Sequence, residues 1–165
     1  MKCVHNWQPL GDLLHCCEQG CAENCASCGH EVETREHLLQ CEHMKSWVTE
    51  LFRELDAFCR CHLTKQELQD TLKEGLGKWL KGEDDLVQPM GGRCNELLKK
   101  QSEVGWDQVL LGRFVNQWKQ VQQEHLRTLP LEQRKLSQSG LTWVTGMSKM
   151  ILNDVCDNWI TQCNK

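Results

Sequence analysis

The distribution of cysteine is the feature that most constrains this chain. The 165 residues include 12 cysteines. Nine of them lie within the first 61 residues, at Cys3, Cys16, Cys17, Cys21, Cys25, Cys28, Cys41, Cys59 and Cys61. In a secreted protein such a cluster would suggest disulfides, but the opening residues MKCVHNWQPLGDLLHCC contain no apolar run of signal-peptide length. We therefore expect an intracellular protein of the nucleus or cytoplasm, not a secreted one, in which clustered Cys and His bind a metal.

Four of these residues have the spacing of zinc ligands. Residues 25–41 read C-x2-C-x8-H-x3-C, which places Cys25, Cys28, His37 and Cys41 in the ligand positions. The close cysteine pair can present two thiolates to one ion, and His37 and Cys41 lie four apart on a helix predicted to start near Thr34. Three thiolates and one imidazole form a closed tetrahedral site. We therefore predict a structural Zn²⁺ centre whose three sulfurs and one nitrogen lie within roughly 4 Å of one another.

Other residues nearby could compete for the same ion. They are His30, His43, Cys16, Cys17 and Cys21. Cys17 and Cys21, combined with Cys25 and Cys28, would give a four-cysteine site, and free thiols in a cysteine-rich chain are a further alternative. The set with His37 is preferred because helical spacing accounts for its last two ligands.

The remainder of the chain has helical periodicity, and no segment alternates as a strand would. Residues 1–33 are expected to be loop. An apolar stripe from Val48 to Cys59 predicts one helix, and a capping box of Thr64 and Glu67 predicts the start of a second. A short helix is expected over 94–101, a longer one after Gly105 with its stripe over 110–125, and a last one from Ser139-Gly140, with its stripe over 144–159.

The predicted fold class is all-α: an antiparallel helical bundle with an N-terminal Cys/His zinc-binding loop-helix module. Its expected core contains Leu51, Leu55, Leu72, Leu76, Phe114, Trp118, Val144 and Ile151. Residues 82–92 hold glycines and a proline and are predicted to be a loop or linker. They would separate residues 1–82, a zinc-binding loop plus two helices, from residues 93–165, a C-terminal helical region, although a single domain also fits.

Charge is distributed unevenly along the chain. The formal net charge of −4 excludes a strongly basic nucleic-acid-binding protein. Residues 93–165, by contrast, hold ten Lys and Arg against seven Asp and Glu, a net charge of +3. A polyanion would therefore meet this half first. The candidates for nucleic-acid contacts are Arg93, Lys99, Lys100, Arg113, Lys119 and Arg127. No apolar stretch approaches the roughly 18 residues of a membrane span, so no membrane partner is expected.

The tryptophans could either pack in the core or stack on the bases of a single-stranded nucleic acid. Trp79, Trp118 and Trp159 lie on apolar helical stripes, so we expect them to pack in the core. The sequence leaves Trp7, Trp47, Trp106 and Trp143 undetermined. His125 shares the stripe of Trp118 and is interpreted as a core histidine.

The metal-binding segment also resembles a known family. Cys25-x-x-Cys28-Gly29, Glu33-Thr34, His37-Leu38-Leu39, Cys41 and Trp47 are similar to the zinc-binding segment that follows the polymerase in reverse transcriptases of non-LTR retrotransposons. Ala26 stands where that family usually has proline. Trp and Gly placement over residues 79–143 also resembles the tails found beyond that segment. The resemblance implies an accessory region that binds RNA or DNA, single-stranded in particular, for a polymerase supplied elsewhere.

The sequence offers no catalytic constellation. A reverse transcriptase needs a carboxylate pair for its two metal ions, usually beside a tyrosine, and this chain has no tyrosine. Its only Asp-Asp pair, Asp84-Asp85, is interpreted as a solvated turn. We therefore expect a non-enzymatic zinc-binding accessory module that binds nucleic acid. The alternative is a zinc-stabilised structural or protein-interaction module that binds none. The sequence does not indicate an oligomeric state.

Overall fold

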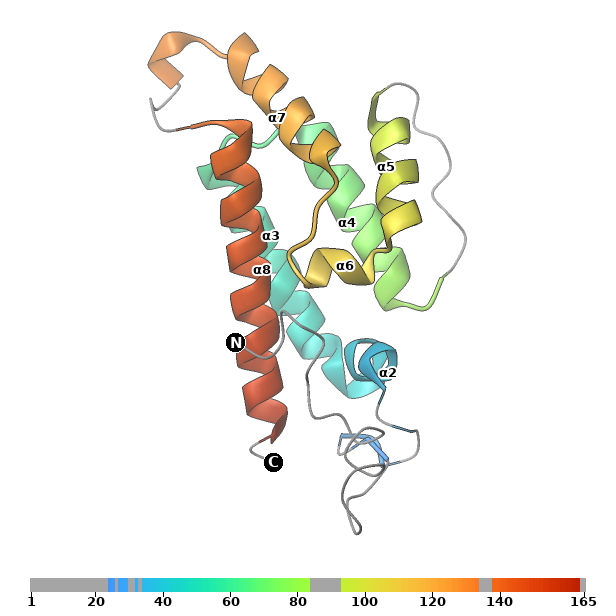
Figure 1. Ribbon diagram of the computed structural model, residues 1–165. Coiled ribbons are helices and arrows are strands. Elements are labelled where there is room, and N and C mark those ends of the chain that lie inside the picture. The colour runs from blue at the N-terminus through green and yellow to red at the C-terminus, as the bar shows by residue number, and fades with distance from the viewer. Residues whose placement is uncertain are drawn as a thin grey trace.

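The computed structural model in Figure 1 describes residues 24, 25, 27–29, 32, 34–83, 93–133 and 138–163. Within these residues every regular element is a helix, which confirms the all-α class. The elements are α2 (Arg35–Gln40), η2 (Glu42–Met44), α3 (Lys45–Cys61), α4 (Gln66–Leu80), α5 (Arg93–Val104), α6 (Asp107–Leu110), α7 (Asn116–Thr128), η3 (Leu131–Gln133) and α8 (Gly140–Cys163). Each helix of this part of the chain is too short or too polar to cross a lipid bilayer.

The start of α4 differs from its prediction. The residue that precedes the helix is Lys65, and no side chain caps it, so the capping box predicted from Thr64 and Glu67 is wrong. The Thr64 hydroxyl instead accepts a hydrogen bond from the indole N–H of Trp143, at 2.7 Å. The Thr64 side chain thus makes a tertiary hydrogen bond in place of the local helix cap that the sequence predicts.

The long helix predicted after Gly105 is also wrong, because two helices stand in its place. Gly112 has a φ of +71°, which ends α6. The amide of Gly112 donates to the Val109 carbonyl at 2.8 Å and that of Arg113 donates to the Gln108 carbonyl at 2.8 Å, the pair of bonds that defines a Schellman cap. The Ser148 hydroxyl on α8 donates to the Gly112 carbonyl at 2.8 Å and fixes this turn. Leu110 and Phe114 therefore lie on different segments.

Side-chain contacts give the directions of neighbouring helices. Trp47 meets Asp154 at one end of the α3–α8 pair, and Phe58 approaches Gly146 further along, so α3 and α8 are antiparallel (Figure 1). α7 and α8 are antiparallel by the same reasoning, because Gly140 lies against Gln123 and Trp143, further along α8, stacks on Trp118, which is earlier in α7. α4 and α5 instead run in the same direction.

The contacts that establish the α4–α5 direction lie at both ends of the pair. The Cys94 thiol, at the start of α5, approaches the Glu67 carboxylate, at the start of α4, at 3.9 Å. Further along, Trp106, just after the end of α5, packs against Gly75 of α4. The α4–α5 pair therefore departs from the predicted antiparallel arrangement.

The predicted core residues lie inside the molecule. Leu51, Leu55, Leu72, Leu76, Trp118 and Ile151 are at most 1% exposed. Phe114 and Val144 are partly buried and pack against the same cluster. That cluster contains side chains from both sides of residues 82–92, from Cys25 to Val155. Residues 84–92 lie outside the described residues, and the division into 1–82 and 93–165 stays a prediction.

Two fully buried glutamines tie the loops to this core. The Gln101 side-chain oxygen accepts from the Trp118 indole at 3.0 Å and from the Val115 amide at 3.1 Å. The Gln122 side chain accepts from the Lys65 amide and donates to the Leu63 carbonyl, each at 3.1 Å. Each glutamine thus satisfies polar groups that burial would otherwise leave unpaired.

Candidate metal centre

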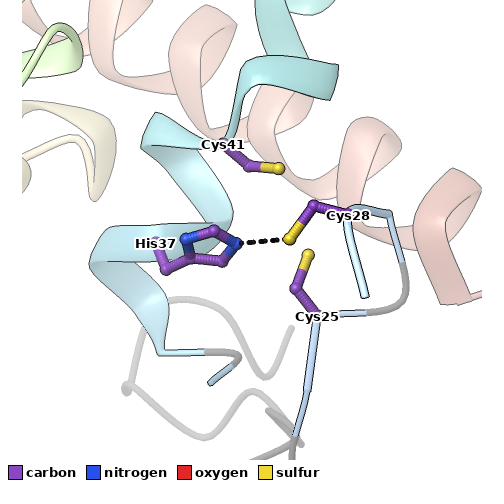
Figure 2. Close-up of side chains that lie close together, drawn as sticks. All are labelled: Cys25, Cys28, His37 and Cys41. Carbon is purple, nitrogen blue, oxygen red and sulfur yellow. Dashed lines mark hydrogen bonds between the residues drawn. The ribbon is translucent and has the colours of Figure 1, made fainter. Parts of the chain in front are cut away.

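Cys25, Cys28, His37 and Cys41 converge on one point, as the spacing predicts (Figure 2). One ligand atom from each residue lies within 4.8 Å of all the others. The Cys28 sulfur is 3.3 Å from Nε2 of His37. A zinc tetrahedron with bonds of about 2.3 Å to sulfur has S–S edges of about 3.8 Å. The ligand atoms are therefore spread more widely than the roughly 4 Å predicted, and closure on an ion requires their widest separation to shorten by about 1 Å.

The first two ligands lie on a tight turn. The Gly29 amide donates to the Cys25 carbonyl at 2.7 Å, which folds residues 25–29 back on themselves. Gly29 has a φ of +73°, a backbone conformation that residues other than glycine adopt only at an energetic cost. An isolated antiparallel bridge between Asn24 and Val32 closes the base of the loop. We call residues 24–41 the knuckle, since this turn and the following helix together hold the four ligands.

The third ligand lies on α2 and the fourth lies just beyond it. Thr34 caps the helix by accepting a hydrogen bond from the His37 amide at 3.0 Å, so the helix starts where the sequence predicts. The helix ends at Gln40, and Cys41 has the extended-type ψ of 136°. Cys41 therefore lies just outside the helix, and the prediction that it belongs to the same helix as His37 is wrong. Its amide still donates to the His37 carbonyl at 2.7 Å, which keeps the two ligands on the same side.

The ligands differ in burial, and burial controls their protonation. Cys25 is 1% exposed and Cys41 is 5% exposed, whereas Cys28 and His37 are partly exposed. Burial raises the pKa of the Cys41 thiol to about 11; the His43 backbone hydrogen bond opposes this rise, and the Cys25 and Cys28 sulfurs add to it. A divalent cation reverses this preference because it stabilises coordinating thiolates directly. The donor set of three sulfurs and one imidazole suits zinc.

The knuckle is attached to the helical body at several points. The Gln40 side chain donates to the Trp79 carbonyl at the end of α4, at 2.8 Å. Leu39, Met44 and Trp47 are buried in the common core cluster together with Cys25 and Cys41. The position of the ligands is thus coupled to the packing of α3 and α4.

A hollow of about 570 Å³ lies beside the centre. It is lined by Cys28, His37, Gln40, Cys41, Glu42, His43 and Lys81. Cys25 does not reach it. Sequence reasoning missed Gln40 and Lys81, since neither is a zinc-ligand type and Lys81 comes from the end of α4, far from the motif. No local pattern signals that this lysine approaches the centre.

The competing ligands have different outcomes. His43 is exposed and lines the hollow, but it is not among the four converging residues. His30, Cys16, Cys17 and Cys21 lie outside the described residues. The structure thus brings together the set that contains His37, and the four-cysteine arrangement stays an untested alternative.

The predicted basic residues belong to α5, to α7 and to the turn after α6, and their contact with nucleic acid stays a prediction. Lys99 is exposed on α5, and Lys100 pairs with Glu96 at 2.8 Å. Arg113 donates to the Gln108 side chain at 2.9 Å. Lys119 and Arg127 are two turns apart on α7 and line one shallow hollow with Glu124. The side chain of Arg93, the first residue of α5, lies outside the described part.

Most of the tryptophans belong to the core. Trp47, Trp106, Trp118 and Trp143 are at most 8% exposed, so none of them presents a ring for stacking on bases. Trp79 is partly buried against the same core, as predicted. Trp7 and the side chain of Trp159 lie outside the described residues, as does the Asp84-Asp85 pair. His125 is half-buried, and its burial lowers its pKa.

Comparison of the chain with known protein families, with curated proteins and with solved structures found no match. The functional interpretation therefore rests on the four converging ligands and their surroundings.

Proposed function

We propose that this protein is a non-catalytic module whose N-terminal knuckle is held to a helical body by one structural Zn²⁺. The observation that carries the proposal is the convergence of Cys25, Cys28, His37 and Cys41 within 4.8 Å. Four protein donors fill a tetrahedral coordination sphere and leave no position for a reacting water, which is the composition of structural rather than catalytic zinc sites. The role of the ion is then to fix chain geometry.

The direct test is elemental analysis of protein purified without added metal. We expect one zinc per chain, lost in Cys28→Ser and Cys41→Ser and retained in the matched controls Cys16→Ser and Cys17→Ser. Zinc that depends on Cys17 and Cys21 instead would assign the site to the four-cysteine arrangement. Protein free of zinc at neutral pH would refute the proposal.

We further propose that the module resembles the C-terminal region of a retroelement reverse-transcriptase-like protein and binds single-stranded RNA or DNA through the C-terminal half. The motif around the ligands supports the first part. The second is supported by the net charge of +3 over residues 93–165 and by Lys119 and Arg127, which line one hollow on α7. Such cations bind the phosphate groups of a nucleic acid. Because this binding releases counterions from the nucleic acid, the affinity depends on salt.

Fluorescence anisotropy with a labelled oligonucleotide separates this role from its alternative. We expect affinity that falls as salt rises, with a slope reduced by about one unit in Lys119→Ala and in Arg127→Ala. Lys149→Ala, which removes an exposed cation from α8, is the matched control and should leave the slope unchanged. Failure to bind single-stranded RNA or DNA at low salt would favour a structural or protein-interaction module.

A further inference from the structure

The four ligands of the proposed zinc centre are unequally accessible. Cys25 is 1% exposed and does not line the hollow of about 570 Å³, Cys41 lines it but is only 5% exposed, and Cys28 lines it and is partly exposed. Of the three sulfurs, only Cys28 thus combines partial exposure with a position on the hollow. A small solute that reacts with sulfur would therefore meet Cys28 first.

The turn places a second thiol next to this exposed one. The hydrogen bond from Gly29 to the Cys25 carbonyl, 2.7 Å long, holds Cys25 and Cys28 on one turn. Figure 2 shows their sulfurs facing each other at the centre of the cluster. A Cys-x-x-Cys pair on a tight turn is an arrangement in which an oxidised sulfur can be attacked by its neighbour.

We propose that Cys28 is a peroxide-reactive modification site through which oxidation releases the zinc, an inference that rests on the proposed zinc centre. The chemical class of the oxidant is a hydroperoxide, with hydrogen peroxide as the simplest member. The hollow admits the oxidant to Cys28, and the buried Cys25 completes the reaction.

The reaction balances in two steps. The Cys28 thiolate attacks one oxygen of hydrogen peroxide, the O–O bond breaks, and the products are Cys28 sulfenic acid and hydroxide. The Cys25 thiolate then attacks the Cys28 sulfur, an S–S bond forms, and the sulfenic oxygen leaves as a second hydroxide. The two sulfurs together lose two electrons, and the peroxide gains them. His37 and Cys41 alone remain as donors, so the zinc leaves. A dithiol reductant restores both thiolates.

Zinc release from the full chain under hydrogen peroxide, followed with a zinc-sensitive dye, tests the proposal. Two variants give the same donor set of two sulfurs and two imidazoles: Cys28→His removes the exposed thiolate, and Cys41→His removes a buried one. We expect Cys28→His to slow release at least tenfold, while Cys41→His stays within about twofold of the unmodified chain. Equal slowing by both, or greater slowing by Cys41→His, would overturn the proposal.

Peptide mapping of the unmodified chain decides the same question if a variant fails to bind zinc. Cleavage after glutamate yields the peptide 24–31, which contains only Cys25 and Cys28, and the peptide 37–42, which contains only Cys41. We expect peptide 24–31 to lose two hydrogen atoms in step with zinc release and to regain them with dithiol. A cross-link between the two peptides would overturn the assignment of Cys25. Zinc content before oxidation tests the proposed zinc centre separately. A chain that holds no zinc before oxidation refutes the zinc centre, whereas a chain that holds zinc and keeps it under peroxide refutes only the oxidation proposal.

Discussion

The knuckle and the helical body reach their structures by different means. The knuckle has one helix of six residues and a turn, and among its described side chains only Cys25 and Leu39 and Cys41 are buried. The body, from α3 to α8, is built from longer helices whose apolar stripes fill a shared core. Four polar or sulfur-containing side chains organise the first region, and dispersed leucines and tryptophans organise the second. Local chemistry therefore dominates one part, and cooperative packing dominates the other.

The difference has an energetic consequence. An isolated helix shorter than about 12 residues is not stable in water, so α2 cannot persist by its own propensity. Zinc binding to peptides of this ligand type is worth on the order of 10–16 kcal/mol at neutral pH. We therefore expect the knuckle to depend on the metal, while the body, with Leu51, Leu55 and Trp118 fully buried, depends on apolar packing.

Removal of zinc with a strong chelator is expected to have the largest effect on this comparison. The amides of Gly29, His37 and Cys41, each in a knuckle hydrogen bond, should lose their protection against hydrogen exchange. Amides in α4, α7 and α8 should keep theirs, and the helical circular dichroism should fall only slightly. Cys25→Ser should reproduce the pattern without chelator. Loss of protection throughout all helices would show that the two regions fold as one unit.

The knuckle was the part that the sequence predicted well, and the reason is physical. Metal ligands require particular side-chain types at particular separations, so Cys25, Cys28, His37 and Cys41 leave a pattern in the chain itself. The same holds for the Thr34 cap, which is local. The apolar positions of the body were also predictable, because helical periodicity places Leu51, Leu72 and Ile151 inside.

What the sequence did not predict depends on contacts between distant residues. The apolar spacing from Leu110 to Phe114 continues in register across Gly112, so periodicity alone cannot detect the break that α8 stabilises. Gln101 and Gln122 are of a residue type that usually lies on the surface, yet both are 0% exposed because distant loop residues form hydrogen bonds with their side chains. Lys81 lines the hollow beside the candidate metal centre only because the end of α4 packs there.

Substitution of two glycines in α4 tests the packing of the body and should leave the knuckle intact. A β-carbon on Gly75 would overlap the ring of Trp106, whereas one on Gly77 would lie 3.6 Å from Phe52, an ordinary contact. Gly75→Ala should therefore destabilise the protein by about 2 kcal/mol, since the ring must move. Gly77→Ala should stabilise it by about 0.5–1 kcal/mol through helix propensity. Thermal unfolding measures both.

Zinc content supplies the control for this glycine pair. Both variants should bind as much zinc as the unmodified chain, because neither glycine contacts the knuckle. Stabilisation by Gly75→Ala would show that Trp106 is not packed against α4, and zinc loss in either variant would show that the knuckle depends on core packing as well as on its ligands.

The joint between the two regions includes one carboxylate in an unfavourable environment. Asp154 of α8 accepts a hydrogen bond from the Trp47 indole at 2.7 Å, just after the knuckle. Burial raises the pKa of Asp154; the Trp47 bond opposes the rise, and Glu54, Glu50 and Asp157 add to it. These four acidic residues line one groove of about 480 Å³ between α3 and α8. Trp47 is thus held by a group whose charge disfavours the folded state.

Asp154→Asn is expected to have the smallest effect, and its pH dependence carries the information. The folded state raises the pKa of this carboxyl, so the unfolded chain ionises first as pH rises and the unmodified protein loses stability between the ordinary pKa and the raised one. Asparagine keeps an acceptor for Trp47 without the charge. Because the group is partly exposed, we expect a gain of only about 0.5 kcal/mol, a rise in Tm of about 1–2 °C at pH 7 that disappears near pH 3. Asp157→Asn, which removes an exposed charge from the same groove, should gain less. The opposite result would be a change in Tm, from the unmodified chain to Asp154→Asn, that is lower at pH 7 than at pH 3. It would show that the charged hydrogen bond to Trp47 stabilises the contact between α3 and α8 more than burial and repulsion weaken it.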